Sequence, residues 1–193
     1  NADIVISILN ELGISKCNIV GWSMGSAVAM SIAKKNKLIV DKLVLITPFS
    51  WLGGAVYNDK LAFKIFVSFV RIRERLFPNF NPKSKFSFLR KANAINDEYT
   101  EWAWNNLHKS KDDFIYADGG RFVVPYDARP WIESIEAETL VITGGKDKLV
   151  PEETSNDVIT RLKNVKVKTF PDAGHSIPWT HEDELIKELK EFF

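Results

Sequence analysis

The feature that most constrains this chain is the pentapeptide at residues 21–25, Gly-Trp-Ser-Met-Gly. An apolar run at 18–20 precedes it, and a stretch of small residues with helical character at 26–33 follows it. A serine between two such elements lies on a sharp strand-to-helix turn, which strains its backbone and holds its hydroxyl above the sheet. The glycines two residues before and two residues after it leave room for the chain to reverse. The pattern predicts a nucleophilic Ser23.

Two further apolar runs end in polar residues that could serve this serine. The run at 139–143 leads into Gly-Gly-Lys-Asp, which ends at Asp147, and the run at 165–170 leads into Pro-Asp-Ala-Gly-His, which ends at His175. A serine hydroxyl needs a base within hydrogen-bonding reach, and histidine titrates closest to neutral pH. A carboxylate behind the histidine fixes its tautomer and stabilises the imidazolium. We therefore expect Ser23 as nucleophile, His175 as general base and then acid, and Asp147 as orienting acid, although Gly-Gly-x-Asp also favours a simple turn.

The chain order Ser, Asp, His, each just past a strand, resembles the α/β-hydrolase superfamily and its nucleophile elbow. The resemblance implies a mostly parallel sheet flanked by helices, with the backbone N–H of Met24 as one oxyanion-hole donor. It covers strands five to eight of that fold, with no equivalent of strands one to four and no His-Gly segment to supply a second donor. We expect the C-terminal part of a longer hydrolase, completed by a missing N-terminal segment or a partner chain, and little activity from these residues alone.

Apolar periodicity predicts alternating helices and strands before residue 49 and after residue 130, with a central region of another kind between them. Helices are expected at 2–12, 24–35, 151–162 and 182–193, and strands at 16–22, 41–48, 139–143 and 165–170. Between 49 and 130 strand alternation disappears and aromatic residues accumulate, at the place where the superfamily inserts a helical cap. We assign residues 1–48 and 131–193 to the α/β-hydrolase core and residues 49–130 to the cap.

Other reactive residues are not expected in the site. His108 is expected to lie in an amphipathic, helical region, and His181 is expected to be a surface residue at the start of the last helix. Asp172, three residues before His175, is expected to be a loop carboxylate. Cys17, the single cysteine, excludes an internal disulfide and is expected to be a small buried side chain.

Composition and charge exclude several kinds of partner. With 26 basic and 25 acidic residues, the net charge of +1 indicates neither nucleic acid nor an acidic membrane surface. The most apolar stretch, 61–70, is far shorter than the roughly 20 residues that span a bilayer, and we expect it to pack under other helices, with a lipid-facing lid as the alternative. Three scattered histidines offer no metal-ligand spacing, so no metal or other cofactor is expected. No secretory signal is visible, which favours a cytoplasmic protein.

These observations predict a serine hydrolase that cleaves a carboxylic ester or thioester, with an apolar substrate, through an acyl-enzyme. The elbow and the segment Gly-His-Ser-Ile-Pro-Trp at 174–179 resemble those of the carboxylesterases that cleave the methyl ester of pimeloyl-carrier protein. Trp22 is expected to contact the substrate or to pack under the cap. Two alternatives stay open. One is C–C bond hydrolysis or perhydrolysis by the same three residues, and the other is a non-catalytic fold member, or inactive fragment, that acts as a binding module.

Overall fold

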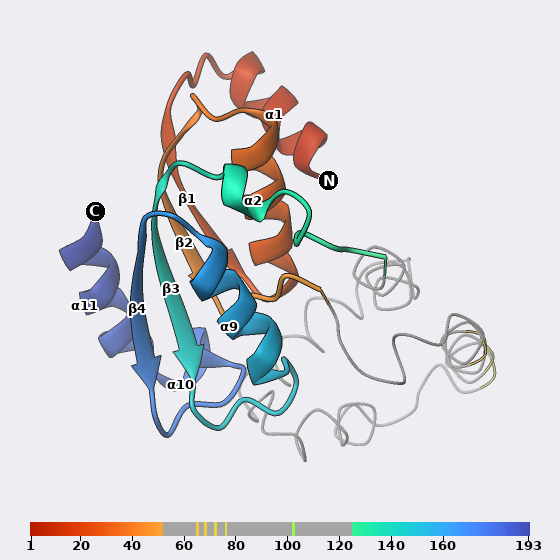
Figure 1. The fold of residues 1–193 in the computed structure, drawn as a ribbon, viewed down its shortest axis with the longest axis vertical. Coiled ribbons are helices and arrows are strands. Elements are labelled where there is room, and N and C mark those ends of the chain that lie inside the picture. Colours follow the sequence, from red (N-terminus) through yellow and green to blue (C-terminus); the bar gives the residue numbers. More distant parts are fainter. Residues whose placement is uncertain (52–64, 66–67, 69–71, 73–75, 77–101, 103–124) are drawn as a thin grey trace.

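The computed structural model describes residues 1–51, 65, 68, 72, 76, 102 and 125–193 (Figure 1). Its described strands form one sheet in the order β1 (Cys17–Trp22), β2 (Val40–Ile46), β3 (Glu138–Gly144), β4 (Val165–Phe170). The described helices are α1 (Ala2–Glu11), α2 (Met24–Lys35), the 3₁₀ turn η1 (Ile132–Ser134), α9 (Glu152–Arg161), α10 (Ile177–Thr180) and α11 (Glu182–Phe192). Each pair of neighbouring strands is parallel, so all four end at the same edge of the sheet. The prediction of a parallel sheet flanked by helices is confirmed.

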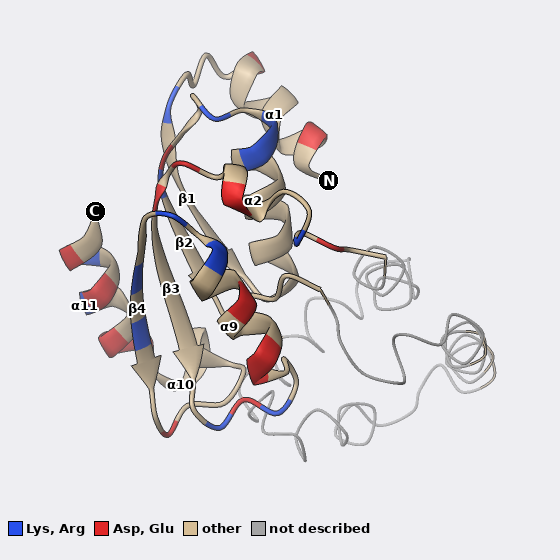
Figure 2. Ribbon diagram, viewed as in Figure 1, with Lys and Arg blue, Asp and Glu red and all other residues tan. Residues whose placement is uncertain are grey.

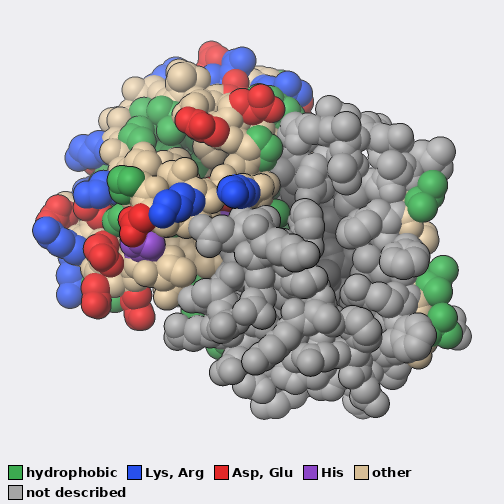
Figure 3. All heavy atoms as spheres, turned by 90° about the horizontal axis from the view of Figure 1, so that it is seen from below, with side chains coloured by type: hydrophobic (Ala, Val, Ile, Leu, Met, Phe, Trp, Pro, Cys, Tyr) green, Lys and Arg blue, Asp and Glu red, His purple; other side chains and the backbone are tan. Residues whose placement is uncertain are grey.

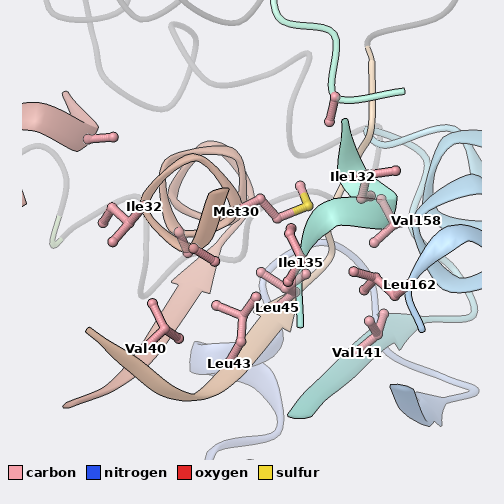
Figure 4. Packing of buried hydrophobic residues seen from close by; sticks show 14 of the residues in the cluster. Met30, Ile32, Val40, Leu43, Leu45, Ile132, Ile135, Val141, Val158 and Leu162 are labelled. Atoms are coloured by element: carbon pink, nitrogen blue, oxygen red, sulfur yellow. The ribbon is translucent and has the colours of Figure 1, made fainter. Parts of the chain in front are cut away.

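Helices cover both faces of the two central strands. On one face Leu43 and Leu45 of β2 pack with apolar side chains of α2, η1 and α9 (Figure 4). The intervening Val44 and Ile46 point to the other face, where they pack in a second cluster with Leu185 of α11. Figure 1 shows the same division, with α2 and α9 on one side of the sheet and α11 on the other. An unbroken apolar strand is what burial on both faces requires.

The first strand is less covered than β2. Ile19 and Val20 are apolar at successive positions, as in a strand covered on both faces, but Val20 is 47% exposed and Asn18 is exposed. Cys17 is only partly buried, so the prediction of a buried thiol is wrong. Among the described residues β1 pairs only with β2, so it is an edge strand of the described sheet.

The remaining elements lie close to their predicted bounds, with two differences. β2 ends at Ile46 rather than at Pro48, because the backbone of Thr47 turns to a φ of 46°. The short helices η1 and α10 were not predicted, since three or four residues carry no periodic pattern. At the end of α1, Gly13 has a φ of 69°, as a glycine after a helix C-terminus is expected to have.

The chain leaves the core after β2 and returns before η1 at one place. Trp51 and Asp127 form an antiparallel bridge, and the N–H of Ala128 donates to the carbonyl oxygen of Ser50 at 2.7 Å. The predicted cap lies almost wholly outside the described residues, as do His108 and most of the apolar stretch 61–70. The five isolated residues described there are each helical: Ile65, Ser68, Ile72, Leu76 and Trp102. The helical cap over 49–130 stays a prediction.

Acidic and basic side chains are interspersed over the described surface (Figures 2 and 3). On β4, Lys166 pairs with Glu138 at 2.8 Å and Lys168 pairs with Glu188 of α11 at 2.5 Å. Exposed lysines of this kind discourage the pairing of a sheet edge with another chain. Among the residues described, no helix combines the length and the apolar character needed to cross a bilayer.

Candidate active site

Ser23 lies at the junction of β1 and α2 in a strained backbone conformation. Its φ of 53° and ψ of −119° are values that few residues other than glycine adopt. The N–H of Ser23 donates to the carbonyl oxygen of Ile46 at 2.9 Å. The buried hydroxyl of Ser26 lies 2.9 Å from the carbonyl oxygen of Gly21 and 3.1 Å from that of Ile46. These contacts fasten the turn to β2 and hold the strained serine in place.

The loops that follow β3 and β4 are bound to each other. The N–H of Lys146 donates to the carbonyl oxygen of Ala173 at 2.8 Å. Gly144 permits this approach, because a Cβ at that position would lie 2.4 Å from the carbonyl oxygen of Gly174. The glycine that the sequence assigns to a turn therefore brings together the two loops that carry the predicted acid and the predicted base.

A line of hydrogen bonds joins the three predicted side chains. Nδ1 of His175 lies 2.8 Å from Oδ2 of Asp147, and Nε2 of His175 lies 2.8 Å from Oγ of Ser23. The imidazole is 3% exposed and the carboxylate 8% exposed. Oδ1 of Asp147 accepts hydrogen bonds from the N–H groups of Leu149 and Val150, at 2.8 and 3.1 Å. The structure thus brings together Ser23, Asp147 and His175, which follow the carboxyl ends of β1, β3 and β4 in one parallel sheet.

The arrangement of donors and acceptors fixes the direction of this line. A carboxylate only accepts hydrogen bonds, so Nδ1 of His175 carries the hydrogen that faces Asp147. Nε2 then presents a lone pair to the hydroxyl of Ser23, which donates to it. In this state the imidazole can take the serine proton, and the resulting imidazolium would face a buried carboxylate that two backbone N–H groups hold in place.

Trp22 and Met24 flank the serine. The indole N–H of Trp22 donates to the backbone carbonyl oxygen of His175 at 2.9 Å, and its ring centroid lies 5.5 Å from that of the imidazole. Trp179 of α10 lies 4.7 Å from Trp22 and 6.0 Å from Trp102, centroid to centroid. Met24 is the first residue of α2, where a helix leaves its backbone N–H groups without an intrahelical partner. The position suits the predicted oxyanion donor.

The other described histidine lies outside this line. Nε2 of His181 is 3.4 Å from Oδ1 of Asp172, and Nδ1 is 2.8 Å from Oγ1 of Thr180. A backbone hydrogen bond of Asp172 itself, and then the contact with His181, lower the pKa of this loop carboxylate. The side chain of His181 is 14% exposed and packs against Asp172 and the ring of Phe170, so this residue is partly buried at the surface rather than fully exposed.

Two residues near the serine have features that the sequence did not indicate. Thr47 combines a φ of 46° with 2% exposure, and among the described residues its hydroxyl has no hydrogen-bond partner. The residue before a proline is normally extended, so Pro48 argues against this conformation. Ser26 carried no signal either, because its two carbonyl partners are brought together only by the fold. In the part of the chain that is described, no three His, Cys, Asp or Glu side chains group as metal ligands would.

Comparison with known proteins identifies the family. The model of the α/β-hydrolase fold family matches residues 1–182, so the chain belongs to this family. The 2-hydroxy-6-oxo-6-phenylhexa-2,4-dienoate hydrolase of Burkholderia cepacia is 27% identical over 203 residues, covering 100% of this chain and 68% of that protein. The 2-hydroxy-6-oxononadienedioate/2-hydroxy-6-oxononatrienedioate hydrolase of Comamonas testosteroni is 26% identical with the same coverage.

Solved structures show the same fold. An esterase from Exiguobacterium antarcticum superposes with a TM-score of 0.79 at 16% identity, over 99% of this chain and 71% of that one. A meta-cleavage product hydrolase from Pseudomonas fluorescens gives a TM-score of 0.68 at 19% identity, over 100% and 70%. The predicted superfamily is therefore confirmed, and both the fold and the names of the relatives are those of hydrolases.

Proposed function

We propose that this protein is a serine hydrolase, with Ser23 as nucleophile, His175 as general base and then acid, and Asp147 as orienting acid. The observation that carries the proposal is the unbroken line of two 2.8 Å hydrogen bonds through the buried imidazole. A serine with positive φ costs on the order of 1–3 kcal/mol, and such strain persists where it serves a site. A module that only binds a ligand has no use for a strained hydroxyl aligned with a buried base.

The proposed reaction has two halves. In the first, Oγ of Ser23 bonds to a substrate carbonyl carbon while its proton passes to Nε2 of His175, and the N–H of Met24 stabilises the oxyanion. The bond to the leaving group then breaks, and His175 returns the proton to that group. In the second, water gives its proton to His175 and its oxygen to the acyl carbon. The Ser23 ester bond then breaks, and His175 returns the proton to Oγ.

We propose that the bond cleaved is the C–C bond beside the ketone of a 2-hydroxy-6-oxo-dienoate. The support comes from the relatives, since proteins with names of this type are 24–27% identical to the chain along 97–100% of its length. We therefore favour C–C bond hydrolysis, the alternative in the sequence analysis, over ester or thioester cleavage. The ring of Trp22, beside the imidazole, would contact the substrate where the leaving group departs.

Turnover by the natural full-length protein tests the proposal. The enzyme is offered 2-hydroxy-6-oxo-6-phenylhexa-2,4-dienoate and p-nitrophenyl butyrate in parallel. We expect kcat/KM for the dienoate to exceed that for the ester by at least ~10²-fold. Ser23→Ala should lower turnover by ~10⁴-fold or more, while Ser7→Ala, a matched change at an exposed serine of α1, should leave it unchanged.

Each outcome decides a different part of the proposal. Preference for the ester, with dependence on Ser23, would contradict C–C cleavage and restore the ester prediction. Turnover that persists in Ser23→Ala would contradict the serine mechanism itself. No turnover of either compound by a folded protein would favour the binding module.

A cytoplasmic location stays a prediction from the sequence, which fractionation of the host cells would test.

A further inference from the structure

We infer that Trp22 is a positioning residue for His175, and that it acts through the hydrogen bond from its indole N–H to the backbone of the histidine. The inference rests on the proposed function, because it concerns the geometry of the proposed base. It is distinct from substrate contact by the Trp22 ring. The ring is one surface of the site, whereas the N–H is already bound to the protein.

The position of Trp22 in the chain gives this bond its significance. Trp22 is the last residue of β1 and directly precedes Ser23, while His175 follows it by 153 residues. The indole N–H reaches the carbonyl oxygen of His175 at 2.9 Å. The strand that holds the nucleophile is therefore bonded to the backbone of the base, independently of the bond between Oγ and Nε2.

The histidine needs a support of this kind. His175 lies between β4 and α10, in a segment that belongs to neither a strand nor a helix. The hydrogen bonds of its imidazole to Asp147 and to Ser23 leave from opposite sides of the ring. They therefore resist movement of the ring along the direction between these two partners more than movement perpendicular to it. The bond from Trp22 acts on the backbone and its ring packs beside the imidazole, with centroids 5.5 Å apart. A displacement of about 1 Å at a catalytic group can lower a rate by ~10²-fold.

Simple packing is the competing explanation. Trp22 is partly buried against the cluster that contains Val44 and Ile46, and its ring also contacts Trp179. If packing were its only role, removal of the N–H with the ring kept would change neither stability nor the histidine. The two explanations therefore differ in what happens when the N–H alone is lost.

The experiment replaces Trp22 in the natural full-length protein by 3-benzothienylalanine, which has the shape of tryptophan with sulfur in place of N–H, and in parallel by phenylalanine. The control is Trp131→Phe. The indole N–H of Trp131 donates to the backbone carbonyl oxygen of Asp127 at 3.1 Å, and this bond is partly buried, as is the bond from Trp22. Measurements are melting temperature, kcat, KM and the far-downfield proton NMR signal of the His175 Nδ1–H.

For both Trp22 replacements we expect kcat to fall about tenfold. In the benzothienyl variant, which keeps the shape of the ring, KM should stay within about twofold of the wild type. The Nδ1–H signal should broaden or shift, whereas Trp131→Phe should leave both kcat and the signal unchanged. A benzothienyl variant with wild-type kcat and an unchanged signal would overturn the inference and leave the proposed function standing. If the wild type shows no Ser23-dependent turnover, the proposed function fails, and the NMR signal still decides whether Trp22 positions the histidine.

Discussion

The carboxyl ends and the amino ends of the four strands differ in where strain and charge lie. At the carboxyl ends, Ser23 and Thr47 hold positive φ angles of 53° and 46°, and an imidazole is buried against a carboxylate. At the amino ends, charged residues pair in contact with solvent: Lys16 lies 2.7 Å from Asp41, with side chains 60% and 53% exposed. The carboxyl ends of the strands therefore hold strained backbone conformations, whereas the amino ends hold ion pairs that are exposed to solvent.

The same sheet supports both ends, so the difference comes from the loops. Strained residues persist only where their surroundings over-determine them. Here the Ser26 hydroxyl holds the turn at Ser23, and the N–H of Thr47 donates to the carbonyl oxygen of Ile142 at 2.7 Å. An exposed ion pair contributes only about 0–1 kcal/mol and constrains nothing nearby. Strain and buried polar groups therefore locate the site, whereas the charge distribution does not.

The largest expected effects are on activity at the carboxyl ends. His175→Ala should lower kcat by ~10⁴- to 10⁶-fold, because it removes the proposed base, and Asp147→Asn by about 10⁴-fold, because it favours the wrong tautomer. Saturation kinetics on the substrate that the enzyme prefers would measure both. His181→Gln is the control, since His181 bonds to Asp172 and Thr180 instead, and its kcat should stay close to wild type. A loss smaller than tenfold in His175→Ala would contradict the assignment.

The two glycines of the elbow give a matched pair of stability tests. A Cβ on Gly21 would lie 2.4 Å from the carbonyl oxygen of Gly25. A Cβ on Gly25 would meet no described atom within 4 Å beyond its chain neighbours and the backbone of its own helix. Gly21→Ala should therefore lower the free energy of unfolding by about 3 kcal/mol or prevent folding. Gly25→Ala, inside α2, should raise it by up to ~1 kcal/mol. Urea unfolding measures both, and equal effects would contradict the observed packing of the turn.

Thr47 tests whether strain at the carboxyl ends can be relieved. A left-handed conformation costs a residue with a Cβ about 1–2 kcal/mol, and a buried hydroxyl with no partner in the described part of the chain adds to that cost. Thr47→Gly removes both, at the expense of some chain entropy, so the free energy of unfolding should rise by about 1 kcal/mol. Destabilisation of the variant would mean that the threonine side chain makes a favourable contact that outweighs its strain.

The smallest effect is expected at the amino ends. Asp41→Asn breaks the exposed pair with Lys16 and should change the free energy of unfolding by less than about 0.5 kcal/mol. The measurement is urea unfolding at low and at high salt. A change above 1 kcal/mol would show that charge at this end contributes far more than its exposure indicates, and the contrast between the two ends would no longer hold.

Much of the fold and the proposed triad was accessible from the sequence. Periodicity placed the four strands, and because parallel strands end at one edge, the order of Ser23, Asp147 and His175 was enough to predict that they meet. The burial of individual residues was less accessible. Cys17 was misjudged because burial depends on which elements cover a residue, and local sequence does not show that.

Contacts between distant loops were beyond prediction. Three contacts in the site join residues that are far apart in the chain or lie on different elements, and no local pattern predicts them. They are the close approach of Gly144 to Gly174, the hydrogen bond from the Ser26 hydroxyl to Gly21, and the hydrogen bond from Trp22 to His175. Thr47 was harder still, since the proline that follows it favours the opposite conformation. Sequence patterns predict where helices and strands lie. The contacts between loops and the conformation of Thr47 depend instead on how the ends of those helices and strands pack together.

The central claim is that Ser23, His175 and Asp147 act as one unit. The most direct measurement is the reaction of the natural full-length protein with a fluorophosphonate, followed by mass spectrometry of the adduct. The account predicts a single adduct on Ser23, formed at least ~10²-fold more slowly in a folded His175→Ala variant. An adduct on another residue, or an equal rate of labelling without the imidazole, would contradict it.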